Sequence, residues 1–239
     1  MILGKGTPHY GYCFEEIDKA VSELTDRVVV FNEKHHFKAP PGSIIFNLEN
    51  VPGQVDPGLW ADHEIWDCSE RNISRYPEGI PVKYVPMGYH PSMKRFERKP
   101  QKKRDIDVVF CGWPNERRAV ILNEMRRLGL RVEVPSYSVW GKERDELIGR
   151  AKLALDMRYY EDGIFPALRS LHLVSNGMPV LAETSPEMPL WVKSHVPYDK
   201  LVSRAIELVR EEARRETLAA ESFSMLESFP LTLPVLGFE

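Results

Sequence analysis

The sequence predicts an α/β protein made of two lobes, each with a parallel sheet. Short apolar strand patterns alternate with helix patterns along both halves of the chain, which is typical of parallel strands joined by crossover helices. A basic segment, residues 94–104, interrupts this alternation near the middle and holds seven Lys or Arg residues and one Glu. A polar, proline-containing segment of this kind is typical of a solvated linker between lobes.

The first half carries the weaker pattern. It opens with a short strand, Ile2-Leu3, followed by a loop rich in Gly and Pro. Apolar residues three and four positions apart then predict a helix over Phe14–Leu24. Strands are expected at Val28–Phe31 and Ile44–Leu48, so this half also follows the strand–helix–strand order of a parallel sheet.

The second half alternates more strictly and predicts a doubly wound unit, with Asn115 as the N-cap of its first helix and Gly129 just after that helix. Strands are expected at Val108–Phe110, Arg131–Val134, Leu153–Met157 and Pro179–Ala182, and helices at Glu116–Leu128, Lys142–Ala151, Ala167–Asn176 and Asp199–Leu226. Ligands of such open sheets bind beyond the carboxyl ends of the strands. The loops at those ends contain CGWPNERR, RYYEDGIF and ETSPEM.

These loops combine groups that suit an anion. Gly112 permits a tight turn, and the first amides of the helix after Asn115 point toward the loop, as in helix N-terminal anion sites. Arg117 and Arg118 add positive charge there, and Arg169 lies in the first turn of another helix. A diphosphate binds well to such amides and guanidinium groups. The alternative is that Arg117 and Arg118 are solvated surface residues.

Other site chemistries are not indicated. Asp105-Ile106-Asp107 matches the D-x-D pattern of metal-dependent transferases, but it begins a strand beside the basic linker, and we interpret it as a chance match. No His, Asp or Glu cluster has metal-ligand spacing, and phosphate-loop and nucleophile-elbow motifs are absent. We therefore expect no metal and no cofactor. The three scattered cysteines are expected to be free thiols.

Composition indicates an ordinary globular protein. Hydrophobic residues make up 43% and charged residues 28% of the 239-residue chain, whose net charge is −3. The sequence contains no apolar run of the length that spans a bilayer and no signal-peptide pattern at its start. We expect a cytoplasmic protein that is a monomer or a weak dimer.

Longer segments resemble a known family. IDVVFCGWPNERRAVILNEMRRLGLRVEV and GKERDELIGRAKLALDMRYYEDGIFPALRSLHLVSNGMPVLAE resemble the donor-binding lobe of group-1-like glycosyltransferases of bacteria and phages. IIFNLENV, IWDCSERN and VPMGYHP resemble the end of that family's N-terminal lobe. The resemblance covers roughly residues 44–220.

The resemblance implies a GT-B fold, in which two Rossmann-like lobes face each other across a cleft, here with an abbreviated N-terminal lobe. It implies a metal-independent transferase that moves a sugar from a nucleotide sugar, with UDP as the expected nucleotide, to an acceptor hydroxyl. The expected domains are an acceptor-side lobe (1–96), a basic linker (97–104), a nucleotide-sugar-binding lobe (105–220) and a tail (221–239) that packs back on the N-terminal lobe.

Carried onto this sequence, the resemblance implies donor-binding roles for Gly112, Asn115, Arg117, Arg118, Tyr160, Glu161, Arg169 and Glu183. A carboxylate such as that of Glu183 suits the ribose, because it accepts two hydroxyl hydrogen bonds. One departure concerns a pair of Glu residues eight positions apart that the family carries before G-x-P-V. Those positions hold Ile164 and His172 here, so Glu161 or Glu183 is the expected substitute.

Two residues are candidates for the catalytic base. His9, in the loop after the first strand, and Glu49, just past the strand Ile44–Leu48, are both expected near the cleft. The alternative for each is a structural or surface role.

The acceptor is open. The basic linker could contact a nucleic-acid backbone, which makes a hydroxymethylated base in phage DNA one candidate acceptor. The residues of this expected contact are Lys94, Arg95, Arg98, Lys102, Lys103 and Arg104. A plain solvated linker is the alternative for this segment. Two alternatives for the whole chain are a non-catalytic nucleotide- or sugar-binding module derived from such a transferase, and a structural partner protein that uses its C-terminal helix.

Overall fold

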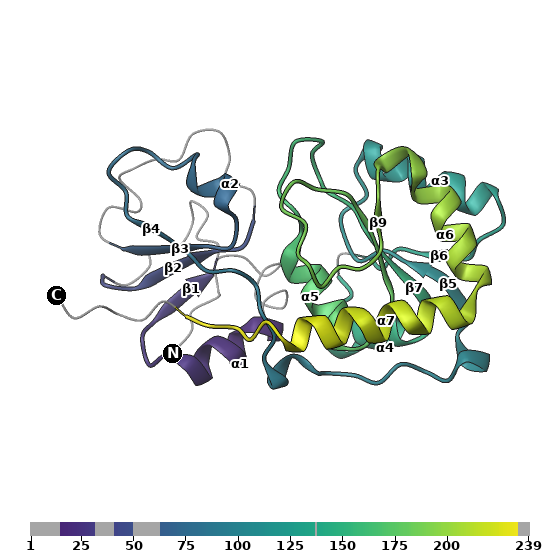
Figure 1. The fold of residues 1–239 in the computed structure, drawn as a ribbon, viewed down its shortest axis with the longest axis horizontal. Helices are drawn as coiled ribbons and strands as arrows, with labels where there is room; N and C mark the ends of the chain where they lie inside the picture. Colours follow the sequence, from purple (N-terminus) through teal and green to yellow (C-terminus); the bar gives the residue numbers. More distant parts are fainter. Residues whose placement is uncertain (1–14, 32–40, 50–62, 137, 234–239) are drawn as a thin grey trace.

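The computed structural model describes residues 15–31, 41–49, 63–136 and 138–233. They form two lobes, each built around its own parallel sheet, with the N-terminal lobe on the left of Figure 1 and the C-terminal lobe on the right. The prediction of an α/β protein with parallel sheets is confirmed. The expected strand Ile2-Leu3 lies outside the described residues.

The N-terminal lobe has a four-stranded sheet in the order β1-β2-β3-β4, and every neighbouring pair is parallel. Its strands are β1 (Val29–Phe31), β2 (Ile44–Asn47), β3 (Glu64–Asp67) and β4 (Val82–Tyr84), and its helices are α1 (Glu15–Leu24) and α2 (Glu70–Ile73). Alternate residues of the strands face opposite sides. Phe46 and Trp66 pack on the side covered by α1, whereas Ile45 and Ile65 pack with Tyr76 on the other side.

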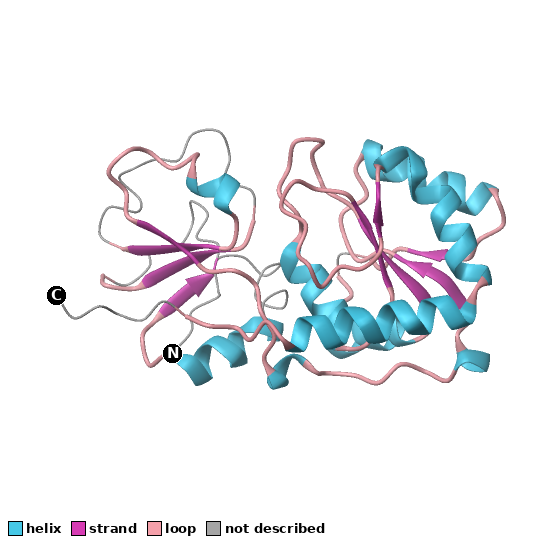
Figure 2. Ribbon diagram, viewed as in Figure 1, coloured by secondary structure: helices cyan, strands magenta, loops and turns pink. Residues whose placement is uncertain are grey.

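The C-terminal lobe has a five-stranded parallel sheet in the order β6-β5-β7-β8-β9. Its strands are β5 (Ile106–Val109), β6 (Val132–Glu133), β7 (Ala151–Asp156), β8 (Val180–Glu183) and β9 (His195–Val196), and its helices are α3 (Glu116–Arg127), α4 (Gly141–Gly149), α5 (Ala167–Ser175), α6 (Leu201–Arg210) and α7 (Glu212–Glu227). Helices enclose this sheet on both faces (Figure 2). The chain leaves β5 toward β6 on one side and returns to β7 on the other, so β5 and β7 flank a topological switch point.

Local sequence signals explain the first helix of this lobe. Asn115 is the N-cap of α3, and its side-chain oxygen accepts a hydrogen bond from the backbone N–H of Arg118 at 3.0 Å. Gly129 follows the helix with φ of 89°, a left-handed conformation that glycine adopts without steric cost. Both predicted signals are therefore confirmed.

The prediction of a single long helix over Asp199–Leu226 is wrong. The structure has a 3-10 turn (Tyr198–Lys200) followed by two helices, α6 and α7, with a break at Glu211. The buried guanidinium of Arg215 donates hydrogen bonds to the carbonyl oxygens of Leu208 and Val209, both at 2.6 Å. These bonds satisfy carbonyls of the last turn of α6, so the helix can end without a glycine or proline.

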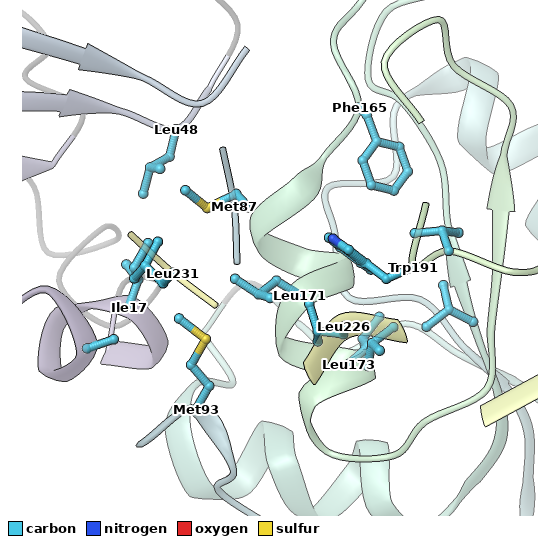
Figure 3. Packing of buried hydrophobic residues seen from close by; sticks show 14 of the residues in the cluster. Ile17, Leu48, Met87, Met93, Phe165, Leu171, Leu173, Trp191, Leu226 and Leu231 are labelled. Carbon is cyan, nitrogen blue, oxygen red and sulfur yellow. The ribbon is translucent and has the colours of Figure 1, made fainter. Parts of the chain in front are cut away.

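One apolar cluster continues from lobe to lobe. It includes Ile17 of α1 and Met87 on the N-terminal side, and Leu171 of α5 and Leu226 of α7 on the C-terminal side, and Figure 3 shows these side chains between the lobes. Leu231 joins the same cluster, and residues 229–231 pair with Tyr89 through two backbone hydrogen bonds of 2.7 and 2.8 Å. A second cluster fills the space between α3, α6 and the C-terminal sheet.

Among the described residues, every helix is too short or too polar to cross a membrane.

Candidate functional site

The candidate site lies at the carboxyl ends of β5, β7 and β8, beside the switch point between β5 and β7. Three loops leave the sheet there, and side-chain hydrogen bonds join two of them. Asn115 Nδ2 donates to the carbonyl oxygen of Tyr159 at 2.8 Å, which ties the loop after β5 to the loop after β7. The sequence expectation that these loops share one edge of the sheet is confirmed by the strand order.

Gly112 and Arg169 come together at this edge. A Cβ atom added to Gly112 would lie 2.8 Å from Arg169 Nη1 and 2.9 Å from the Phe110 ring. The Arg169 guanidinium also lies over the Phe110 ring, 5.3 Å from its centre. The space at Gly112 therefore holds the guanidinium, which is a more specific reason for glycine than the tight turn expected from the sequence.

A buried carboxylate faces Arg169. Asp156 ends β7, and its Oδ1 lies 3.2 Å from Arg169 Nη1, while its other oxygen accepts a hydrogen bond from the Ser170 hydroxyl. Burial raises the pKa of Asp156, and the Arg169 charge and the Ser170 hydrogen bond act in the opposite direction. The buried Asp156 side chain therefore lies behind Arg169 and orients its guanidinium at the edge of the sheet.

Glu183, at the end of β8, lies between two arginines. Its carboxylate pairs with both terminal nitrogens of Arg117, and it accepts hydrogen bonds from Arg158 Nε at 3.2 Å and Nη2 at 2.7 Å. The Arg117 guanidinium also stacks on Tyr198, 4.1 Å from the ring centre. Burial favours a higher pKa for Glu183, but the hydrogen bonds of the two arginines outweigh it, so the pKa is below its usual value.

Arg118 holds the loops together. It is buried and donates hydrogen bonds to the carbonyl oxygens of Trp113 at 2.9 Å, Met157 at 2.6 Å and Arg158 at 3.1 Å. Burial lowers the pKa of Arg118 to about 9, and the charge of Arg169 acts in the same direction. The guanidinium remains protonated at neutral pH, and its donors are directed at backbone oxygens.

The remaining expected donor residues lie at the surface of the same edge. Tyr160 is 56% exposed and packs edge-on against Tyr159. Glu161 is exposed, and its carbonyl oxygen accepts a hydrogen bond from Arg158. Glu161 therefore borders Arg158 directly, whereas Tyr160 is next to the arginines only through Tyr159, whose ring centre lies 5.1 Å from the Arg118 guanidinium.

The two positions where the family carries glutamate are filled by buried side chains. Ile164 packs inside the lobe. His172 Nε2 lies 2.9 Å from Asp145 Oδ1 and 3.3 Å from Arg144 Nη2, and its ring packs against Phe96. His172 is thus part of a buried polar cluster between α4, α5 and the linker.

On the N-terminal lobe, the candidate base Glu49 follows β2, and its backbone is held by a polar network. Asn47 Nδ2 and Asn72 Nδ2 donate to the carbonyl oxygen of Glu49 at 2.8 and 2.7 Å. Both amides also donate to the carboxylate of Asp67, at 2.7 and 3.1 Å, and the Tyr76 hydroxyl donates to Asp67 at 2.8 Å. Burial raises the pKa of Asp67 to about 6 despite these donors. His9 lies outside the described residues.

The basic linker runs along the C-terminal lobe toward the amino end of β5, away from the candidate site (Figure 1). A plain solvated linker would leave Arg98 and Arg104 exposed to water. Both side chains instead pair with Glu216 of α7, at 2.8 and 2.7 Å. Arg95 Nε lies 3.6 Å from Asp145. The expected contact residues that remain exposed are Lys94, Arg95, Lys102 and Lys103.

Asp105 and Asp107 also lie at the amino end of β5. Asp105 pairs with Arg150 at 2.5 Å, and Asp107 pairs with Lys152 at 2.7 Å and with Arg131 at 3.3 Å. The D-x-D pattern is therefore occupied by ion pairs at the end of the sheet opposite the candidate site.

Sequence reasoning missed three residues of the site: Arg158, Asp156 and Glu187. Arg158 and Asp156 stand at the carboxyl end of β7, so the rule that located the other loops could have found them. Glu187, in the loop after β8, contacts the N-terminal lobe: it accepts hydrogen bonds from the Ser69 hydroxyl at 2.7 Å and from the backbone N–H of Arg71 at 2.9 Å. No local pattern signals a contact between residues so far apart in sequence.

Similar sequences exist among curated proteins. The chain is 27% identical over 225 residues to an uncharacterized protein of Acanthamoeba polyphaga mimivirus, an alignment that covers 90% of this chain and 24% of that protein. A second uncharacterized protein of the same virus is 27% identical over 137 residues, which is 54% of this chain and 44% of that protein. The chain thus spans less than half the length of these relatives. No protein-family model matches it.

Solved structures of glycosyltransferases share the fold. WaaG, a glycosyltransferase involved in lipopolysaccharide biosynthesis, aligns with a TM-score of 0.59 and 14% identity over 96% of this chain and 82% of WaaG. A variant of TarM from S. aureus, in complex with fondaparinux, α-GlcNAc-glycerol and UDP, aligns with a TM-score of 0.52 and 8% identity over 92% of this chain and 56% of TarM. The expectation from the family resemblance is confirmed at the level of the fold: the chain has the GT-B fold of glycosyltransferases.

Proposed function

We propose that the chain is a glycosyltransferase that takes a sugar from a nucleotide-sugar donor, a UDP-sugar, and transfers it to an acceptor hydroxyl. The observation that carries this proposal is the gathering of Arg117, Arg158 and Arg169 at the carboxyl edge of the C-terminal sheet, next to the switch point. A diphosphate carries spread negative charge, and guanidinium groups bind it in a bidentate manner.

Helix α5 supports the same role. It begins at Ala167, two residues before Arg169, and its N-cap Pro166 makes no side-chain capping bond. The first amides of a nine-residue helix are natural partners for a phosphate, and the helix dipole favours negative charge there. In the proposed reaction these amides and Arg169 stabilise the diphosphate as it leaves the sugar.

Glu183 has a second part in the proposal. Its carboxylate pairs with both Arg117 and Arg158. A bound diphosphate replaces this carboxylate as their partner, and the released carboxylate accepts hydrogen bonds from the ribose hydroxyls. On the acceptor side, His9 and Glu49 are the candidate general bases for the acceptor hydroxyl.

Calorimetric titration with UDP, GDP and ADP tests the donor site, and hydrolysis of the matching nucleotide sugars tests catalysis. We expect binding of UDP together with slow release of free sugar. A protein that binds none of these nucleotides would contradict the proposal. Binding without turnover would instead favour the non-catalytic binding module, an alternative supported by Ile164 and His172 at the family's two glutamate positions.

For the acceptor we propose a hydroxyl group, with the hydroxymethylated bases of phage DNA as one candidate. The exposed residues Lys94, Arg95, Lys102 and Lys103 support a nucleic-acid contact through the basic linker. A gel shift with hydroxymethylated duplex DNA over a salt series tests it, since phosphate contacts weaken steeply as salt rises. Absence of binding at low salt would remove DNA as the acceptor and leave the donor site unaffected.

A further inference from the structure

Glu187 joins the two lobes at the carboxyl ends of both sheets. Its Oε2 accepts a hydrogen bond from the Ser69 hydroxyl, and its Oε1 accepts one from the Arg71 N–H. Ser69 is the N-cap of α2 and follows closely after β3, whereas Glu187 follows closely after β8. One carboxylate therefore bridges the ends of a strand from each sheet.

The loop that carries Glu187 is anchored. Met188, next to it, packs against the apolar cluster shared by the lobes, and Trp191 and Val192 are buried within that cluster. Glu187 itself is half-buried. Because the neighbours of Glu187 are fixed by packing, its carboxylate holds the first turn of α2 in a defined position relative to the C-terminal lobe.

On the other side of the contact, hydrogen bonds continue to Glu49. Ser69 Oγ accepts a hydrogen bond from the Asn72 N–H at 3.2 Å, and the buried Asn72 side chain donates to the Glu49 carbonyl oxygen at 2.7 Å. The same amide donates to Asp67 at 3.1 Å. The backbone that carries the candidate base is thus held through α2, whose first turn is held by Glu187.

The same segment reaches the donor site. Three residues separate Glu187 from Glu183, the partner of Arg117 and Arg158. We infer that Glu187 is a positioning residue: it sets the backbone at Glu49 against the arginines that hold the diphosphate. This inference rests on the proposed transferase function. The simpler alternative is that Glu187 only caps α2 and stabilises that short helix.

Three variants separate these roles. Glu187→Ala removes both hydrogen bonds, and Glu187→Gln retains one acceptor oxygen. Glu70→Gln is the matched control, because Glu70 is an exposed carboxylate in the first turn of α2 itself. Each full-length variant is measured for UDP affinity, for turnover in UDP-glucose hydrolysis, and for amide hydrogen exchange over residues 44–49 and 69–73.

For Glu187→Ala we expect UDP affinity within about twofold of wild type, whereas turnover falls roughly tenfold or more, as for a misplaced catalytic group. Amide exchange should rise at residues 47–49 as well as in α2, because the restraint extends beyond the helix. Glu187→Gln should lie between Glu187→Ala and wild type, and Glu70→Gln should match wild type.

Two results would overturn the positioning role alone: unchanged turnover in an active Glu187→Ala protein, or faster exchange confined to α2 with residues 47–49 unaffected. A wild-type protein that neither binds UDP nor hydrolyses UDP-glucose would overturn the proposed function, and the positioning role with it. The exchange measurement needs no ligand, so the two failures are distinguishable.

Discussion

The two sheets present their carboxyl ends to each other but carry different side chains there. The C-terminal edge holds Arg117, Arg158 and Arg169 around two buried carboxylates. The N-terminal edge holds one buried carboxylate, Asp67, surrounded by neutral hydrogen-bond donors such as Asn47. The first arrangement leaves positive charge for an anionic ligand, whereas the second holds a backbone loop in a fixed geometry.

The largest effect is expected from Arg169→Ala on the C-terminal edge. The substitution leaves Asp156 buried without its cation, so the free energy of unfolding should fall by about 3 kcal/mol. UDP affinity should fall roughly tenfold, because a charge-assisted contact to the diphosphate is lost. Urea unfolding and calorimetry measure the two effects.

Arg150→Ala is the matched control for Arg169→Ala. It breaks an Arg–Asp pair on the same sheet, but this pair is exposed and lies at the amino end of the strands. Both stability and UDP affinity should stay close to wild type. An equal loss of UDP affinity in the two variants would contradict a specific role for Arg169.

On the N-terminal edge, Asp67→Asn should lower the free energy of unfolding by about 2 kcal/mol. The asparagine presents an amide where Asp67 accepts hydrogen bonds, so one buried donor loses its acceptor. UDP affinity should be unchanged, because Asp67 is on the opposite lobe. A loss of UDP binding in a folded Asp67→Asn protein would show that the two edges do not have separate roles.

The stability of the protein should also depend on pH through Asp67. The pKa of Asp67 is about 6, above its usual value of 3.8. The folded state therefore holds this proton more tightly than the unfolded chain does, and the contribution of Asp67 to stability is largest at low pH and falls as the pH rises through 6. Relative to Asp67→Asn, wild type should lose about 1 kcal/mol between pH 5 and 7.5. Parallel pH profiles of unfolding would rule out the raised pKa.

The smallest effect is expected from Gly112→Ala. The new methyl group meets the end of the Arg169 side chain and, at 2.9 Å, the buried Phe110 ring, so both must shift. UDP affinity should fall roughly fivefold, equivalent to about 1 kcal/mol, and the free energy of unfolding should fall by about 1 kcal/mol. If Gly112→Ala bound UDP as tightly as wild type, the position of Arg169 beside Gly112 would be unimportant for binding.

Much of the C-terminal lobe could be predicted from sequence because its signals are local. One stretch of chain contains the N-cap Asn115, the regularly spaced apolar residues of α3 and the terminating Gly129. The break between α6 and α7 could not be predicted, since it depends on where Arg215 folds back. Strands β3 and β4 were also missed, because they are short and lack a clear alternation.

The candidate site divides in the same way. The location of the site at the carboxyl edge of the sheet could be predicted from the strand order, and so could the placement of Gly112 and Arg117 near that edge. The side-chain pairs of the site could not be predicted, because the pairing of Glu183 with two arginines depends on how three loops pack. The charge run of the linker likewise gave no sign that Arg98 and Arg104 would pair with Glu216.

The apolar cluster shared by the lobes should make the two lobes unfold together. Because Met87 and Leu231 pack in the same cluster as Leu171 and Leu226, neither lobe can melt without exposing apolar surface of the other. Calorimetry should therefore record one cooperative heat-absorption peak for the chain. A fragment that contains one lobe alone would expose its part of this apolar cluster to water. Such a fragment should aggregate under conditions in which the whole chain stays in solution.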